Sequence, residues 1–96
     1  MEKLESTPAL FATFVMGMMS ATLVELGIVE DPVSKKKRVQ TEAARQHIDL
    51  LIMLQEKTKG NLSSDEHGLL TRVLTDLRME YVKVAASSNA KMEMKK

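Results

Sequence analysis

The sequence predicts an all-α fold, in which two helices form a hairpin and an N-terminal apolar helix packs across it. Apolar residues recur at helical spacing in three segments, residues 8–26, 41–57 and 64–84, and helix-start and helix-stop residues bound these segments. A chain of 96 residues holds one such domain and is too short for two. We therefore expect a lead at residues 1–7, a three-helix domain at 8–84 and a flexible tail at 85–96, which has no apolar period.

The first helix is expected to run from Pro8 to Leu26. Proline suits the first helical position, and Gly27 supplies a left-handed stop. The segment is apolar nearly all the way round, which predicts burial on more than one side. Small residues recur every four positions and would let another helix approach closely: Ala9, Thr13, Gly17 and Ala21. The bulkier residues are expected to lie largely away from this small-residue stripe: Phe11, Phe14, Val15 and Met18.

A loop is expected over residues 28–40, because Asp31 precedes Pro32 and proline disfavours the helical conformation of the residue before it. The loop contains the basic run Lys35–Arg38, a pattern found in nuclear import signals and nucleic-acid patches. The chain has a net charge of only +1, and no aromatic residue interrupts the run. We therefore interpret the run as a solvated loop and expect no nucleic-acid partner.

The second and third helices are expected at Thr41–Lys57 and Ser64–Val84. Gly60 is placed to end the second helix, and Ser63 with Glu66 forms the S-x-x-E pattern of a capping box that starts the third. The second helix has a wide apolar stripe that predicts partners on two sides. The third has a single apolar face at 3–4 spacing: Leu70, Val73, Leu74, Leu77, Tyr81 and Val84.

Opposite charges fall at matching levels when the hairpin is folded about Asn61. Arg45 is then level with Asp76, and Asp49 is level with Arg72. We predict that these four residues form two structural ion pairs, Arg45–Asp76 and Asp49–Arg72, which fix the register of the two helices. If the pairs are exposed, each contributes only about 0.2–1 kcal/mol.

The hairpin region resembles a bacterial family named domain of unknown function 1844. The family pattern is a helix with ID-L-ML-EKT-GNL followed by a helix with DLRM-YV. It matches this sequence at Ile48-Asp49, Leu51, Met53-Leu54, Glu56-Lys57-Thr58, Gly60-Asn61-Leu62, Asp76-Leu77-Arg78-Met79 and Tyr81-Val82. The first helix is also similar, with Phe14-Val15 and the Leu26-Gly27 ending before a loop that contains proline. The resemblance covers about four-fifths of the chain and leaves out the basic loop and the Met-rich tail. It implies a small, mostly helical cytoplasmic protein, and it brings no known reaction, ligand or site residue.

Signals for catalysis or metal binding are missing from the sequence. The chain has no cysteine, which excludes a thiolate metal site, a disulfide scaffold and a cysteine nucleophile. His47 and His67 are expected about 10 Å apart along the hairpin, too far for one ion, and we interpret them as a packing residue and a first-turn surface residue. No serine lies in a G-x-S-x-G turn, and no glycine-rich run precedes a helix. We expect no enzyme activity, no cofactor and no metal.

These observations favour an interaction or assembly module that is cytoplasmic and self-associates through the first helix as a homodimer or small homo-oligomer. The identity of any other protein partner is left open. One alternative is a membrane-associated protein that uses residues 8–24 as an anchor. This stretch has no charged residue but is slightly short of the ~20 that a bilayer needs. The other alternative is a weak nucleic-acid binder that uses residues 35–38.

Overall fold

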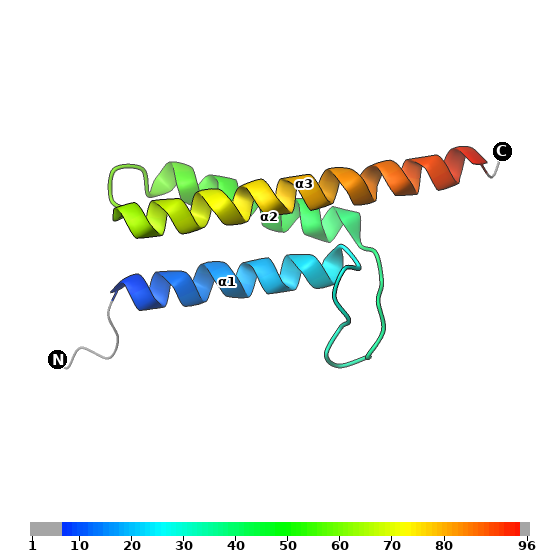
Figure 1. The fold of residues 1–96 in the computed structure, drawn as a ribbon, viewed down its shortest axis with the longest axis horizontal. Helices are drawn as coiled ribbons and strands as arrows, with labels where there is room; N and C mark the ends of the chain where they lie inside the picture. Colours follow the sequence, from blue (N-terminus) through cyan, green and yellow to red (C-terminus); the bar gives the residue numbers. More distant parts are fainter. Residues whose placement is uncertain (1–6, 95–96) are drawn as a thin grey trace.

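The computed structural model describes the backbone of residues 7–94 and the side chains of residues 9–87. Three helices make up this part of the chain: α1 (Thr7–Glu25), α2 (Thr41–Lys57) and α3 (Ser64–Met94). The predicted all-α fold is confirmed, and the three helices lie at the predicted segments, although α3 continues past its predicted end. α1 and α3 lie lengthwise beside each other, and α2 lies behind α3 and runs in the opposite direction (Figure 1). All three pairs of helices are in contact.

The core lies where the three helices meet. α3 contributes the largest share through Leu70, Val73, Leu74 and Leu77, which are all buried, as the spacing along this helix predicts. α2 contributes Ile48 and Leu51, and α1 contributes Val15. Partly buried apolar residues surround this centre: Phe11, Met18, Met19, Leu23, Ile52, Leu54, Leu62, Leu69 and Tyr81. Because this core draws on all three helices, α1 is an integral part of the domain.

α1 ends in a Schellman motif. Gly27 has a φ of 76°, its N–H donates to the Val24 carbonyl at 3.0 Å, and the Ile28 N–H donates to the Leu23 carbonyl at 3.0 Å. Thus Gly27 is the predicted left-handed stop. A Cβ atom at this position would lie 2.8 Å from Cγ2 of Val39, so the end of the following loop packs closely against the glycine.

The turn between α2 and α3 follows its sequence signals. Gly60 has a φ of 85°. The Ser63 N–H donates to Oε1 of Glu66 at 2.9 Å, and the Glu66 N–H donates to Oγ of Ser63 at 3.2 Å. This is the reciprocal capping box that the sequence predicts. Glu66 is buried although it carries a charge, because its carboxylate accepts the hydrogen bond of the box.

The third helix is longer than the sequence predicts. It continues past Val84 as far as Met94 and extends beyond the ends of α1 and α2 (Figure 1). No glycine or proline follows Val84, and Ala85 and Ala86 are strong helix formers, so no residue in this part of the chain ends the helix. A periodic apolar face is a sign of packing, and its absence does not end a helix.

Candidate interaction surface

The small residues predicted as an interface all lie on the outward side of α1. Ala9, Thr13, Gly17 and Ala21 are exposed. An added Cβ at Gly17 would meet no other atom within 4 Å, so space outside this glycine is open. The structure therefore places the stripe at the surface, where a second helix could reach it.

Large apolar side chains are also exposed on the outward half of α1, with Phe14 at one edge of this half and Met16 at the other. Leu10 is 54% exposed, Phe14 is 55% exposed and Met16 is 46% exposed. The expectation that Phe14 lies away from the small-residue stripe is wrong. With 3.6 residues per turn, positions 10, 14, 17 and 21 fall on one side of α1, whereas Val15 and Thr22 are buried on the other. We call the set Leu10, Thr13, Phe14, Met16, Gly17 and Ala21 the α1 outer face.

No charged residue interrupts the α1 outer face. The first charged residue after the start of α1 is Glu25, its last residue. Ser20 and Thr13 are the polar side chains that share the exposed side. An exposed apolar surface of this continuity, on a helix that is already packed on its other side, makes the α1 outer face a candidate interaction surface.

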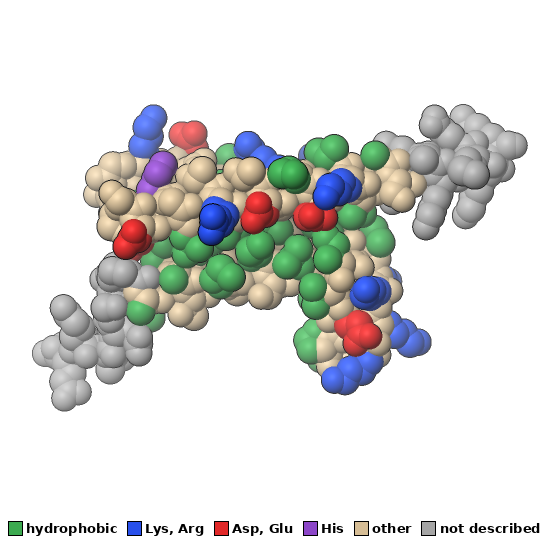
Figure 2. Space-filling model, in the orientation of Figure 1, with side chains coloured by type: hydrophobic (Ala, Val, Ile, Leu, Met, Phe, Trp, Pro, Cys, Tyr) green, Lys and Arg blue, Asp and Glu red, His purple; other side chains and the backbone are tan. Residues whose placement is uncertain are grey.

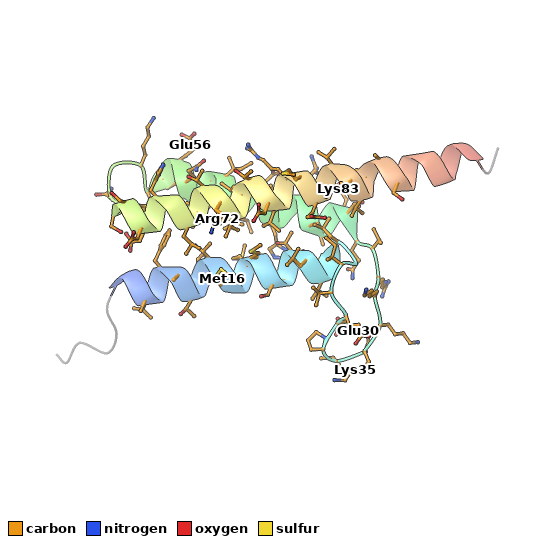
Figure 3. The ribbon with its side chains drawn as sticks, in the orientation of Figure 1. Met16, Glu30, Lys35, Glu56, Arg72 and Lys83 are labelled. Atoms are coloured by element: carbon orange, nitrogen blue, oxygen red, sulfur yellow. The ribbon has the colours of Figure 1, made fainter. Side chains whose placement is uncertain are left out.

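Neither of the predicted hairpin ion pairs is formed. Arg45 pairs with Glu42 of its own helix, Nε to Oε1 at 3.3 Å, and not with Asp76. Among the described side chains, Asp49 and Arg72 form no ion pair, and both are exposed. Two residues at the same level along the hairpin axis form an ion pair only if their side chains also face each other. Arg72 lies on the near side of α3, whereas α2 lies behind α3 (Figure 3).

Asp76 instead borders a groove between α1 and α3. This groove has a volume of about 220 Å³ and is lined by Met19, Leu23, Ile28, Asp76, Leu77, Met79 and Glu80. Figure 2 shows the same arrangement as a row of acidic and basic side chains along α3, above a band of apolar side chains next to α1. Asp76 is therefore exposed beside α1 and does not meet Arg45 of the hairpin partner.

A polar contact that the sequence did not predict joins α1 to α2. Nδ1 of His47 lies 2.6 Å from Oε1 of Glu25, and both side chains are largely buried. The Glu25 carbonyl also accepts a hydrogen bond from the Gln40 N–H at 2.6 Å. Thus His47 has a polar partner besides its packing role. The pair depends on the loop bringing the start of α2 back to the end of α1, which no helical period signals.

The loop that carries the basic run is held by Asp31. Its Oδ1 accepts hydrogen bonds from the N–H groups of Val33 and Ser34 at 2.7 and 3.1 Å, and its own N–H donates to the Lys36 carbonyl at 2.9 Å. Lys35 has a φ of 63°. The side chains from Lys35 to Arg38 are exposed, as expected for a solvated loop.

Other candidate sites in the described part of the chain offer less. A depression of about 450 Å³ lies at the hairpin turn and is lined by Gln55, Glu56, Thr58, Lys59, Gly60, Leu62, Ser63, Ser64 and His67. His67 is exposed, in agreement with its interpretation as a surface residue. Within residues 9–87, no three His, Asp or Glu side chains gather as metal ligands would. None of the described helices has the length and apolar character needed to cross a bilayer.

Comparison with known proteins identifies the family. The model of a family described as "Domain of unknown function (DUF1844)" matches residues 8–83. The chain belongs to the DUF1844 family. The resemblance is thereby confirmed, and the match also includes the basic loop, which the resemblance had left out. Neither a curated protein nor a solved structure gives a match. DUF1844 has no assigned function, so the function of this chain must be argued from its own surfaces.

Proposed function

We propose that this chain is a non-enzymatic assembly module of the bacterial cytoplasm that forms a homodimer through the α1 outer face. The observation that carries the proposal is the exposure of Leu10, Phe14 and Met16 on a helix side without charges. Exposed apolar area of this kind is stabilised when another surface covers it. The small residues Thr13 and Gly17, at the middle of the same face, would let that surface approach closely.

A second copy of the chain fits the α1 outer face better than a charged partner does. A partner with a strongly charged surface would leave its charges without partners on this face, and such charges are costly to desolvate. Two copies related by a two-fold axis would place small residues of each against the bulky Leu10 and Phe14 of the other. Closed two-fold dimers are also the most common form of homo-oligomer.

The area of the face sets the expected strength of the dimer. α1 has 19 residues and is therefore about 28 Å long. The exposed half of a helix of this length, about 10–12 Å across, presents roughly 500 Å². Two copies would bury about 1,000 Å², which is at the lower limit of specific interfaces. We therefore expect a dissociation constant in the micromolar range, which is typical of a reversible dimer.

A membrane surface is the competing occupant of the same face. Helices that lie in the membrane interface carry Lys or Arg on the side opposite their apolar face. α1 has no basic residue, and its other side is packed on α2 and α3. These features favour a protein surface over a lipid surface.

The proposal is tested with two variants of the α1 outer face and one control. Phe14→Glu places a charge on the face, and Gly17→Leu places a bulky side chain where an added Cβ would meet no other atom within 4 Å. Val33→Glu introduces the same charge as Phe14→Glu at a loop residue that is 89% exposed. Sedimentation velocity at tens of micromolar should show a dimer for the wild type and Val33→Glu, and loss of the dimer for both α1 variants.

Two results would contradict the proposal. In the first, Phe14→Glu and Val33→Glu self-associate equally. In the second, the wild type is monomeric and binds phospholipid vesicles, and Phe14→Glu removes that binding, which would assign the face to a membrane. Circular dichroism would confirm that each variant retains its helices, so that loss of the dimer is not loss of the fold.

A further inference from the structure

The charged row along α3 is a second surface with an organised pattern. Asp65, Arg72, Asp76 and Lys83 fall within about 40° of one another around the helix at 100° per residue. All four are exposed. Figure 3 shows Arg72 and Lys83 on the same side of the molecule as Met16 of α1, and Figure 2 shows the row beside the apolar band.

The charges of this row are arranged symmetrically about Leu74, with opposite signs at equal distances. Arg72 and Asp76 lie two residues before and after Leu74, and Asp65 and Lys83 lie nine residues before and after it. Two apolar residues follow the same symmetry: Leu69 and Met79 lie five residues before and after Leu74. Met79 is 54% exposed, and Leu69 is half-buried.

The charges at the centre of the row are not used within the chain. Arg72 and Asp76 are four residues apart on one helix, a spacing at which opposite charges often pair. Across the described side chains, however, the ion pairs are Arg45–Glu42, His47–Glu25 and Lys83–Glu80, so Arg72, Asp76 and Asp65 have no ionic partner. Lys83 has one, at 3.6 Å, but the pair is largely exposed and therefore weak.

We infer that the α3 row pairs with the same row of a second copy in antiparallel orientation. A two-fold axis level with Leu74 would place Arg72 opposite Asp76 of the second copy and Asp65 opposite its Lys83, and each of these contacts occurs twice. Leu69 would lie against Met79 of the second copy. Glu80 would be level with Gly68 of the second copy and would meet no like charge. A parallel pairing would instead place identical charges opposite each other.

The apolar groove supports this occupant. The groove between α1 and α3 lies directly beside the row. Asp76 belongs to both, and Met79 also lines the groove. A second α3 laid along the row would therefore cover apolar surface as well as charges. The row from Asp65 to Lys83 is about 27 Å long, and with α1 beside it the face presents roughly 500 Å².

This inference goes beyond the α1 dimer, because its contacts come from α3 and not from the α1 outer face, of which Met16 lies on the same side of the molecule as the row (Figure 3). Each of the two surfaces would pair with the same surface of a second chain. A chain that uses both surfaces can therefore form a tetramer or a larger closed assembly. The two contacts differ in character. The α3 contact is electrostatic and is weakened by salt, whereas the α1 contact is apolar and is not.

A charge exchange tests the α3 pairing. Arg72→Asp would oppose an aspartate to Asp76 of the second copy, and Asp76→Arg would oppose an arginine to Arg72. The combined Arg72→Asp/Asp76→Arg variant restores both contacts with the signs exchanged. Arg78→Asp is the matched control, since Arg78 is exposed on a different side of the same helix.

The variants are measured in the full chain that also carries Phe14→Glu, so that the α1 contact does not mask the result. In sedimentation velocity at low salt, each single reversal should weaken self-association by about tenfold or more, because one attractive contact per copy becomes repulsive. The dissociation constant of the exchanged variant should return to within about threefold of the value for the Phe14→Glu chain. Arg78→Asp should leave self-association unchanged. Raising the salt from 50 to 500 mM should weaken the self-association of the Phe14→Glu parent chain several-fold.

Three results would overturn the inference: a parent without self-association, an exchanged variant that remains as weak as the single reversals, or a control that weakens association equally. None of these depends on whether the α1 dimer exists. If Phe14→Glu leaves the wild-type dimer intact while the charge exchange behaves as described, the proposed α1 function fails and the α3 pairing stands.

Discussion

The glycines provide a graded test of the backbone in this structure, because the same Gly→Ala change should have different effects at different positions. Gly68 lies in α3, and an added Cβ would meet nothing within 4 Å. Gly60 has a φ of 85° but is also open around the Cβ position. Gly27 has a φ of 76° and little space, since the Cβ would lie 2.8 Å from Cγ2 of Val39.

The expected magnitudes follow from these environments. Gly68→Ala should raise the free energy of unfolding by about 0.5–1 kcal/mol, because alanine is the better helix former. Gly60→Ala should lower it by about 1–2 kcal/mol, which is the cost of the left-handed conformation for a residue with a Cβ. Gly27→Ala adds the displacement of Val39, a stiff β-branched side chain, at about 0.5–1.5 kcal/mol. Its total cost should therefore be about 1.5–3.5 kcal/mol.

Urea denaturation followed by circular dichroism at 222 nm measures these differences at one fixed protein concentration, which keeps any self-association constant. For a domain of this size, 1 kcal/mol corresponds to about 4–8 °C in Tm. The order Gly68→Ala, wild type, Gly60→Ala, Gly27→Ala is expected from most to least stable. A Gly27→Ala variant that is as stable as Gly60→Ala would refute the close packing of the loop against the end of α1.

Three further predictions concern the polar contacts. Ser63→Ala should lower the free energy of unfolding by about 1 kcal/mol, because it removes the cap of α3, and urea titration measures the loss. A double-mutant cycle on His47→Ala and Glu25→Ala should give a coupling energy of about 0.5–1.5 kcal/mol, as expected for a partly buried hydrogen bond, whereas a coupling near zero would mean that the contact does not contribute to stability. Asp49→Lys should change stability by less than about 0.5 kcal/mol, and adding Arg72→Asp should not rescue it, because the two side chains do not meet; a clear rescue in thermal denaturation would reinstate the hairpin pair.

The sequence alone predicts the parts of this fold that depend on local signals. Gly27 and the Ser63–Glu66 capping box determine where helices end and begin, and the structure shows both in the expected conformation. The buried face of α3 follows from spacing alone, because a helical period identifies which residues share a side. The end of α3 is different. Absence of an apolar period after Val84 does not stop a helix, which continues to Met94.

The contacts between helices are where the prediction from sequence fails. Counting residues from the turn gives the level of Arg45 and Asp76 along the hairpin, but not the rotation of each helix about its own axis. That rotation is set by the third partner: α1 packs against both hairpin helices and leaves Asp76 beside α1. The His47–Glu25 contact depends in the same way on the path of the loop, which ends beside α1 through the hydrogen bond from Gln40 to Glu25.

The same difference applies to the candidate surface. Sequence periodicity identifies the small-residue stripe, and the structure places Ala9, Thr13, Gly17 and Ala21 at the surface. Sequence periodicity does not predict that Phe14 is exposed beside them, because a helix that is apolar all the way round gives no indication of which side faces the core. Only the packing against α2 and α3 decides that Val15 is buried and Phe14 is not.

The mass of the intact wild-type chain in solution tests the central claim most directly. Sedimentation equilibrium from about 1 to 100 μM covers the range in which an interface of this size should form and dissociate. The account predicts a mass that rises with concentration from the monomer value of 10.7 kDa to twice that value or more. A folded chain that remains at 10.7 kDa throughout this range would contradict self-association through either surface.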